Sequence, residues 1–168
     1  MRLESLLLLA VRRFLPLMTL LFLSLPLQSQ ALGGNPDAIA GVWLVADGSG
    51  RIEIARCGET YCGRIVWLKE PYYPPGDKGG MEGKPLLDRE NPIKELRSRP
   101  QLGLKIMEGY TFRGNNLWDD GTIYNTENGS SYRSRLSLKA PDRLELRAFL
   151  GIAIFGGSTV WKRVTDQK

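Results

Sequence analysis

The sequence predicts an all-β domain of about eight antiparallel strands, closed into an up-and-down barrel with one short helix and a long loop. Two observations predict this fold. Short segments of alternating apolar and polar residues recur along the chain, and turn signals such as Asp-Gly and Asn-Gly separate them. A sandwich of two sheets is the alternative. A closed barrel is favoured because closure leaves no unpaired edge strand.

The first 31 residues are expected to be a removable signal peptide. Basic residues come first, then an apolar run with two prolines, then a triplet whose outer residues are small: Arg2, Arg12 and Arg13, residues 14–27 with Pro16 and Pro26, and Ser29-Gln30-Ala31. This order is typical of export signals, with cleavage near Ala31. A membrane anchor is the alternative, but the interrupted run is short for a membrane span. We therefore expect a periplasmic or secreted mature chain without a transmembrane span.

Residues 32–168 are expected to form a single β-barrel domain. Removal of the leader leaves 137 of the 168 residues, which is enough to bury a core without a metal. The leader carries three arginines and one glutamate, so the net charge falls from +5 to +3. Because this charge is small and evenly mixed in sign, nucleic acid is not an expected partner.

The first three strands are expected at 39–46, 51–57 and 61–68. The turn 47–50 ends the first strand, and the second and third form a hairpin. One register of this hairpin gives three pairs: Cys57 with Cys62, Ile54 with Ile65, and Ile52 with Trp67. That register places the large apolar side chains on one face. The two cysteines are the only ones in the chain, and in an exported protein they predict a disulfide.

A long irregular loop is expected from Lys69 to about Asn91. Prolines and glycines exclude a long helix or strand there: Pro71, Pro74, Pro75, Gly76, Gly79, Gly80, Gly83 and Pro85. A connection of this length in a compact domain is typically a lid, a binding loop or a mobile segment. Asn91-Pro92 then supplies a cap and a first-turn proline for a short helix that ends near Arg99.

The second half of the chain returns to strands. They are expected at 102–112, 122–125, 131–138, 144–150 and 157–164, with a turn at Asp120-Gly121 and a hairpin at Asn128-Gly129. Pairing Leu138 with Leu144 sets Leu136 opposite Leu146. This register joins the apolar faces of two neighbouring strands.

Two short motifs at the ends of the domain resemble the closure signature of lipocalins and calycins. Gly41-Val42-Trp43 stands in the first strand, and Trp161-Lys162-Arg163 stands in the last. In those families a first-strand Trp packs beneath a basic side chain of the final strand, as a planar cation over an indole ring. The resemblance implies that Trp43 and Arg163 seal one end of the barrel.

A longer series of motifs resembles a bacterial exported domain family of unknown function, built as small lipocalin-like barrels. The motifs occur in this order: Cys57-Gly58, 62–68, Asn91-Pro92, 97–100, 102–104, Trp118, 121–124, Asn128-Gly129, Tyr132 and 159–163. They cover nearly the whole mature chain. The resemblance implies an envelope location and a barrel fold. It brings no agreed substrate and no catalytic set.

Catalytic, metal and cofactor sites are not predicted. The chain has no histidine, so it has no Ser-His-Asp or Cys-His site and no histidine metal cluster. Bridged cysteines leave no free thiol nucleophile. The candidate carboxylates alternate with basic residues or stand in turns: Asp77, Asp88, Glu90, Asp119 and Asp120. A carboxylate-dependent hydrolase is therefore the least favoured function.

Binding of a small amphipathic ligand in the barrel, under the 69–91 loop, is the favoured function, because small barrels either fill with side chains or hold one ligand. The candidate binding residues are Trp67, Tyr72, Tyr73, Trp118, Tyr124, Tyr132 and Arg64. Core packing is the alternative role for each aromatic residue. This alternative is weakest for Tyr72 and Tyr73, because loops of this kind rarely bury aromatic rings for packing alone. A second hypothesis is a module that docks on an envelope protein through this loop and the apolar 152–155 segment.

Overall fold

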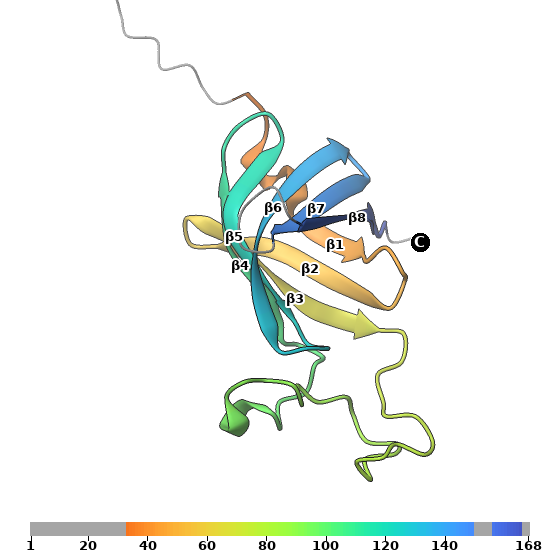
Figure 1. Ribbon diagram of the computed structural model, residues 1–168. Helices are drawn as coiled ribbons and strands as arrows, with labels where there is room; N and C mark the ends of the chain where they lie inside the picture. Colours follow the sequence, from red (N-terminus) through yellow and green to blue (C-terminus); the bar gives the residue numbers. More distant parts are fainter. Residues whose placement is uncertain (1–32, 150–155, 166–168) are drawn as a thin grey trace, which may run out of the picture. The chain divides into compact units, whose positions relative to one another are not determined.

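The computed structural model describes residues 33–149 and 156–165, and within them eight antiparallel strands form one closed barrel (Figure 1). Each strand pairs with the next, and β8 pairs back with β1. The strands are β1 (Gly41–Leu44), β2 (Gly50–Cys57), β3 (Thr60–Leu68), β4 (Lys105–Phe112), β5 (Leu117–Asn125), β6 (Ser130–Ala140), β7 (Arg143–Phe149) and β8 (Gly156–Arg163). The predicted up-and-down barrel is confirmed. The expected signal peptide and the apolar 152–155 segment lie outside the described residues.

The two ends of the barrel are built differently. At the end that we call the closed end, the 3-10 helix η1 (Pro36–Ile39) lies beside the turns at 58–59, 113–116 and 141–142. The turns at 45–49 and 126–129 and the ends of the long loop 69–104 lie at the opposite end, which we call the open end. This alternation follows from the antiparallel order, because successive connections fall at opposite ends.

Large buried side chains fill the closed half of the barrel. The fully buried members are Ile39, Trp43, Ile54, Tyr61, Met107, Tyr110, Trp118, Leu136 and Leu144. Tyr61 meets Trp118 edge to face at 6.5 Å between ring centroids. The indole N–H of Trp118 donates to the Pro36 carbonyl, and that of Trp43 donates to the Ile39 carbonyl. The aromatic core thus also holds η1 against the barrel.

Arg163 lies over Trp43 at the closed end, with the guanidinium carbon 4.2 Å from the ring centroid. The two residues are also register partners in the β1–β8 pair that closes the barrel. A Cβ atom at Gly41 would come within 2.6 Å of the Arg163 guanidinium, and Gly41 has a φ of +132°. The glycine of the Gly-x-Trp motif therefore provides both the backbone conformation and the space for this arginine.

The predicted register of the β2–β3 hairpin is wrong by two residues. Ile52, not Ile54, lies opposite Ile65, and Cys57 lies opposite Thr60. The structure uses a two-residue turn at Gly58-Glu59, with Gly58 at φ +65°, where the prediction required a four-residue loop. The disulfide between Cys57 and Cys62 is present all the same, because it joins diagonal neighbours whose Cα atoms are 5.8 Å apart.

A bulge in the same hairpin turns Trp67 outward. The register shifts between Arg51 and Ile52, so Val66 is an extra residue on β3. One extra residue reverses the alternation of side chains beyond it. Trp67 is therefore 37% exposed, with the Arg51 guanidinium 4.7 Å from its ring, and does not point into the barrel as predicted.

The register predicted for β6 and β7 is confirmed, since Leu138 pairs with Leu144 and Leu136 with Leu146. The predicted turn at Asp120-Gly121 is wrong. These residues lie within β5, where Asp120 at φ +65° and a register shift between Trp118 and Gly121 form a bulge.

The predicted helix up to Arg99 is reduced to one 3-10 turn, η2 (Lys94–Leu96). The Asn91 side chain accepts a hydrogen bond from the Ile93 N–H, and the Arg97 side chain donates to the Asn91 carbonyl. These side-chain bonds compete with the backbone bonds of a longer helix. The first strand is likewise shorter than predicted, because the cap Asn35 and Pro36 begin η1 immediately before it.

Candidate functional site

A cavity of about 560 Å³ opens into the barrel at the open end, and we call it the calyx cavity. Its inner wall is apolar: Val45, Ile52, Ile106, Ile123, Leu146, Ala148 and Trp161. The turns at its mouth are polar, with Asp47, Ser49, Asn125, Thr126 and Glu127, and the wall also includes Tyr132 opposite Ile123 and Thr159 opposite Leu146. Ile52, Leu146 and Trp161 also belong to the buried core, so the floor of the cavity is the top of the packed half.

The cavity exists because the inward positions of β7 and β8 carry small side chains near the open end. Ala148 pairs with Gly157, and Leu146 pairs with Thr159. A Cβ atom built on Gly157 would meet no other heavy atom within 4 Å. Among the described residues nothing fills the space beside this glycine, whereas the same barrel positions at the closed end hold large aromatic rings.

The charged lining residues of the calyx cavity, within the described part of the chain, are two carboxylates. Asp47 lies in the β1–β2 turn and Glu127 lies in the β5–β6 turn. The Asp47 carboxylate accepts hydrogen bonds from the Ser49 N–H at 2.9 Å and the Ser49 hydroxyl at 2.7 Å. These bonds lower the pKa of Asp47, so it is ionised at neutral pH. The rim is therefore negative.

Tyr124 connects the cavity wall to the long loop. It borders the calyx cavity next to the inward Ile123 of β5, and its hydroxyl donates to the Asp88 carboxylate of the loop at 2.6 Å. Asp88 is fully buried and also accepts hydrogen bonds from Asn91 and Arg99, each at 2.8 Å. Burial and this carboxylate raise the pKa of Tyr124, so the phenol stays neutral. The buried Asp88 carboxylate accepts three hydrogen bonds, one of them from Tyr124 of β5, and therefore holds the long loop against the barrel.

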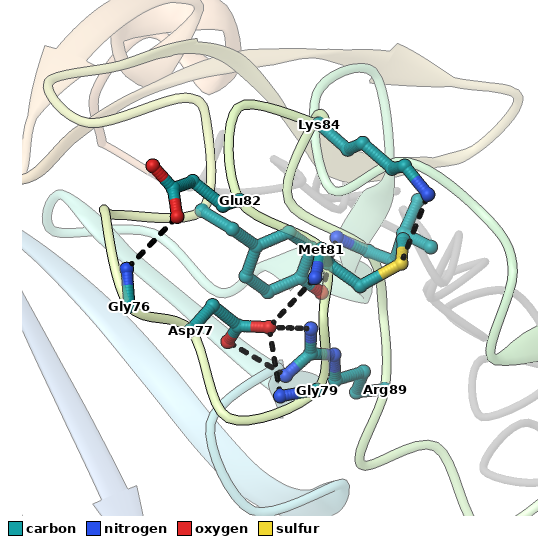
Figure 2. A network of polar contacts seen from close by, with 9 residues as sticks. Gly76, Asp77, Gly79, Met81, Glu82, Lys84 and Arg89 are labelled. Atoms are coloured by element: carbon teal, nitrogen blue, oxygen red, sulfur yellow. Dashed lines mark hydrogen bonds and ion pairs between the residues drawn. The ribbon is translucent and has the colours of Figure 1, made fainter.

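The outer part of the long loop is held by its own contacts. Figure 2 shows Asp77 at the centre, where its carboxylate binds Arg89 through both oxygens and accepts from the Gly79 and Met81 amides. The Arg89 guanidinium lies 3.8 Å from the centroid of the Tyr73 ring. The Tyr73 hydroxyl accepts from the Leu87 N–H. No residue of this loop lines the calyx cavity, so the loop does not cover this cavity, and a ligand position under the loop stays a prediction.

The structure separates the residues proposed for binding. Tyr124 and Tyr132 line the calyx cavity. The other five lie elsewhere: Trp118 in the closed half, Trp67 and Arg64 on the outer surface, Tyr73 beneath Arg89, and Tyr72 on the loop with 57% exposure. A ligand contact through Tyr124 and Tyr132 stays a prediction.

The lining that sequence reasoning missed is the small and aliphatic part. Ile106, Ile123 and Ala148 were not candidates because they lack polar chemistry. The sequence does predict that Ala148 points inward, because it follows Leu144 and Leu146 at a spacing of two on the same strand.

Four of the five carboxylates considered for catalysis, Glu90 being the exception, form ion pairs in the described part of the chain. Asp77 pairs with Arg89, Asp88 with Arg99, Asp119 with Arg135 and Asp120 with Arg113. Within residues 33–149 and 156–165, no three His, Cys, Asp or Glu side chains are grouped so that they could hold a metal ion. The same residues contain no helix that is long and apolar enough to span a membrane.

Residues 41–163 match the model of a family described as "Uncharacterized protein conserved in bacteria (DUF2147)". The chain belongs to this family. The matched residues run from β1 to β8, so the DUF2147 pattern comprises the barrel, including Gly41 and Arg163 at its closed end. A search of curated proteins found no match.

One solved structure is similar to this DUF2147 barrel. It is described as "Protein HP1028 from the human pathogen Helicobacter pylori belongs to the lipocalin family". The two chains share 18% identity with a TM-score of 0.62, over 80% of this chain and 86% of the other. At this identity the likeness shows a lipocalin-like fold and nothing about the ligand.

Proposed function

We propose that this DUF2147 barrel binds a small amphipathic molecule, with the apolar part in the calyx cavity and the polar part at its rim. The observation that carries the proposal is the cavity itself, about 560 Å³ with an apolar floor and a polar mouth. Binding pockets for small molecules commonly fall between about 300 and 1,000 Å³ and have this distribution of polarity. An eight-stranded barrel is also wide enough to hold one small ligand.

The apolar floor supplies the binding free energy. Each methylene group buried against side chains such as Ile52, Leu146 and Trp161 contributes about 0.8 kcal/mol. A chain of eight carbons therefore gains roughly 6 kcal/mol before the costs of association are subtracted. We expect affinity to rise with chain length until the cavity is full, and then to stop rising.

The rim selects the head group. Asp47 and Glu127 place two negative charges at the mouth, so a carboxylate or phosphate head would be repelled there. A neutral or cationic head, such as an alcohol or an amine, would be attracted or tolerated. The expected ligand class is therefore an amphiphile with a neutral or positively charged head.

A displacement titration tests both features of this proposal. N-phenyl-1-naphthylamine, a neutral fluorescent amphiphile, is bound first, and is then displaced by dodecylamine, dodecanol and dodecanoate in separate experiments. We expect displacement in the order amine, alcohol, carboxylate. No binding of the probe, or preference for the carboxylate, would contradict the proposal.

Two neighbouring residues on β8 offer a matched pair of variants. Thr159 points into the calyx cavity, whereas Val160 points outward and is 43% exposed. Thr159→Trp should fill the cavity and abolish probe binding. Val160→Trp adds an indole on the outside and should leave binding unchanged. Loss of binding in both variants would assign the effect to the strand, and not to the cavity.

We also propose that the chain is exported and cleaved near Ala31. The disulfide between Cys57 and Cys62 supports this, because disulfides persist in oxidising compartments. Amino-terminal sequencing of the protein from a periplasmic extract should give a start close to residue 32. A full-length chain in the cytoplasmic fraction would contradict export.

Docking on an envelope protein is a second candidate function. The long loop is stiffened by the contacts of Asp77 and Arg89, yet exposes Tyr72, Ile93 and Leu102 by more than half. Exposed apolar residues on a preorganised loop are typical of protein recognition. A photo-crosslinker at Tyr72 should give one dominant adduct in cells if this function is correct, and a diffuse or empty pattern if it is not.

A further inference from the structure

The outer face of β6, β7 and β8, which we call the basic face, has a large excess of positive charge. Side chains alternate along these strands, and the inward ones are buried, Ser134, Leu136, Leu144, Leu146 and Trp161 among them. The charged residues on the other side of the three strands are Arg133, Arg135, Lys139, Arg143, Arg147 and Lys162, with one acid, Glu145. This is a charge of +5 on one wall, against +3 for the whole of residues 32–168.

The basic face opposes like charges across the strands. Arg135 lies directly opposite Arg147 in the β6–β7 pair. Arg143 lies directly opposite Lys162 in the β7–β8 pair. Directly opposed like charges destabilise a sheet. The folded chain by itself therefore gains no stability from this arrangement.

Internal ion pairs neutralise only part of the basic face. Arg135 pairs with Asp119 at 2.6 Å, and Lys139 pairs with Glu145 at 2.8 Å. In the described part of the chain the remaining four cations, Arg133, Arg143, Arg147 and Lys162, form no ion pair. An external anion would relieve their repulsion.

The shape of the basic face fits an extended anionic surface better than a single small anion. Its cations are spread over three adjacent strands, which are spaced about 4.8 Å apart in a sheet. None of its six cations lines the calyx cavity, the cavity beside Ile93 and Tyr124, or the cavity beside Cys57 and Gly109. Apolar side chains stand among the charges. Phe149 is half-buried, with the guanidinium carbons of Arg135 and Arg147 at 5.4 and 5.8 Å from its ring centroid, and Val160 is 43% exposed.

We propose that the basic face docks the barrel on a bilayer rich in anionic phospholipids. Several cations interspersed with apolar side chains, here the exposed Val160 and the half-buried Phe149, are the features that bind a protein to such a surface. The same strands form the wall of the calyx cavity, since Ala148 and Thr159 line it while Arg147 and Val160 point outward. Docking does not depend on the ligand, but it would bring that wall against lipid.

The test is co-sedimentation with vesicles. The purified chain, its mass recorded to establish its amino terminus, is mixed with vesicles of phosphatidylcholine alone or with 30% phosphatidylglycerol. We expect binding to the mixed vesicles, weakened by salt because the attraction is screened. Each cation near an anionic surface contributes about fivefold to the binding constant.

A pair of triple variants locates the interaction. The first removes three cations of the basic face: Arg133→Gln, Arg143→Gln and Arg147→Gln. The second removes three exposed cations of the long loop: Lys78→Gln, Lys84→Gln and Lys94→Gln. We expect the first to lose binding by about 100-fold, three such fivefold factors, and the second to keep it. Unfolding midpoints measured in parallel show that both variants fold, and relief of repulsion should leave the first at least as stable as the native chain.

Three results would overturn the proposal. Equal losses in the two variants would mean attraction by net charge alone, and equal binding to both vesicle types would mean that anionic lipid is not recognised. Retention on heparin without vesicle binding would identify a soluble polyanion as the partner. Thr159→Trp should leave vesicle binding unchanged, so failure of the ligand proposal and failure of docking are distinguishable.

Discussion

Replacement of Arg163 should open the closed end of the barrel and lower its stability measurably. The guanidinium makes one stacking contact and three hydrogen bonds. It lies 4.2 Å from the centroid of the Trp43 ring. It donates to the carbonyls of Ala38 at 2.6 Å, Ala40 at 2.7 Å and Pro141 at 2.7 Å. These carbonyls belong to the segment around η1 and to the β6–β7 turn, so one side chain ties both to β8.

The magnitude follows from these contacts. A cation over an indole in a partly exposed site contributes about 0.5–1 kcal/mol. Each hydrogen bond from a charged donor contributes about 1.5–3 kcal/mol when buried, and less where water can replace it. Because Arg163 is only half-buried, we expect Arg163→Ala to cost about 3 kcal/mol. Arg163→Lys keeps the charge but cannot reach three divergent carbonyls, so about half of the loss should remain.

Urea unfolding followed by tryptophan fluorescence measures this effect. Arg133→Ala removes an arginine from the outer face of β6 and should change the free energy of unfolding by less than about 0.5 kcal/mol. A double-mutant cycle with Trp43→Phe should give a coupling near 1 kcal/mol. If Arg163→Ala and Arg133→Ala had the same effect, Arg163 would not close the barrel energetically and the reasoning would be refuted.

Three further predictions concern the core, the disulfide and pH. Leu144→Ala, in the packed half, should lower the free energy of unfolding in urea by about 3–4 kcal/mol. Leu146→Ala, beside the cavity, should lower it by about 1 kcal/mol less than Leu144→Ala does. The same Leu146→Ala variant should bind longer-chain amphiphiles more tightly than the native chain. Replacing Cys57 and Cys62 by Ser should cost about 2 kcal/mol in the same assay, since the disulfide closes a loop with a sequence separation of only 5. Burial raises the pKa of Tyr61 from 10.0 to about 12. Because the folded chain holds this proton more tightly than the unfolded chain, the stabilisation is complete below pH 10 and is lost as the pH rises toward 12. Tyr61→Phe should therefore reduce the fall in the free energy of unfolding over this pH range.

The hairpin registers show what apolar alternation can determine. For β6 and β7 the alternation is uninterrupted, so matching Leu136 with Leu146 was sufficient. For β2 and β3 the same reasoning fails, because direct pairing of the cysteines satisfies both the disulfide and the apolar face and yet is not the register of the structure. A disulfide also spans diagonal positions, and the bulge at Val66 reverses the alternation beyond it. Local patterns carry no signal for a single inserted residue.

The loop aromatics show a different limit. Tyr72 and Tyr73 are adjacent and were indistinguishable in the sequence. One is exposed and the other is buried beneath Arg89, which is sixteen positions further along the chain. Their different environments depend on how the loop folds back on itself, through the Asp77–Arg89 pair. A contact between residues so far apart has no periodic signature, so sequence reasoning could not assign either ring to packing or to binding.

The division of the barrel into a packed half and a hollow half follows from side-chain volume at inward positions. Both halves have apolar inward residues, so apolar alternation alone does not distinguish them. Toward the closed end those positions hold Trp43, Trp118 and Tyr110, whereas toward the open end of β7 and β8 they hold Ala148 and Gly157. An eight-stranded barrel has nearly the same width along its axis, so small side chains leave space that large ones fill. Once the register is known, the volume of the inward residues at each level therefore predicts where the barrel can hold a ligand.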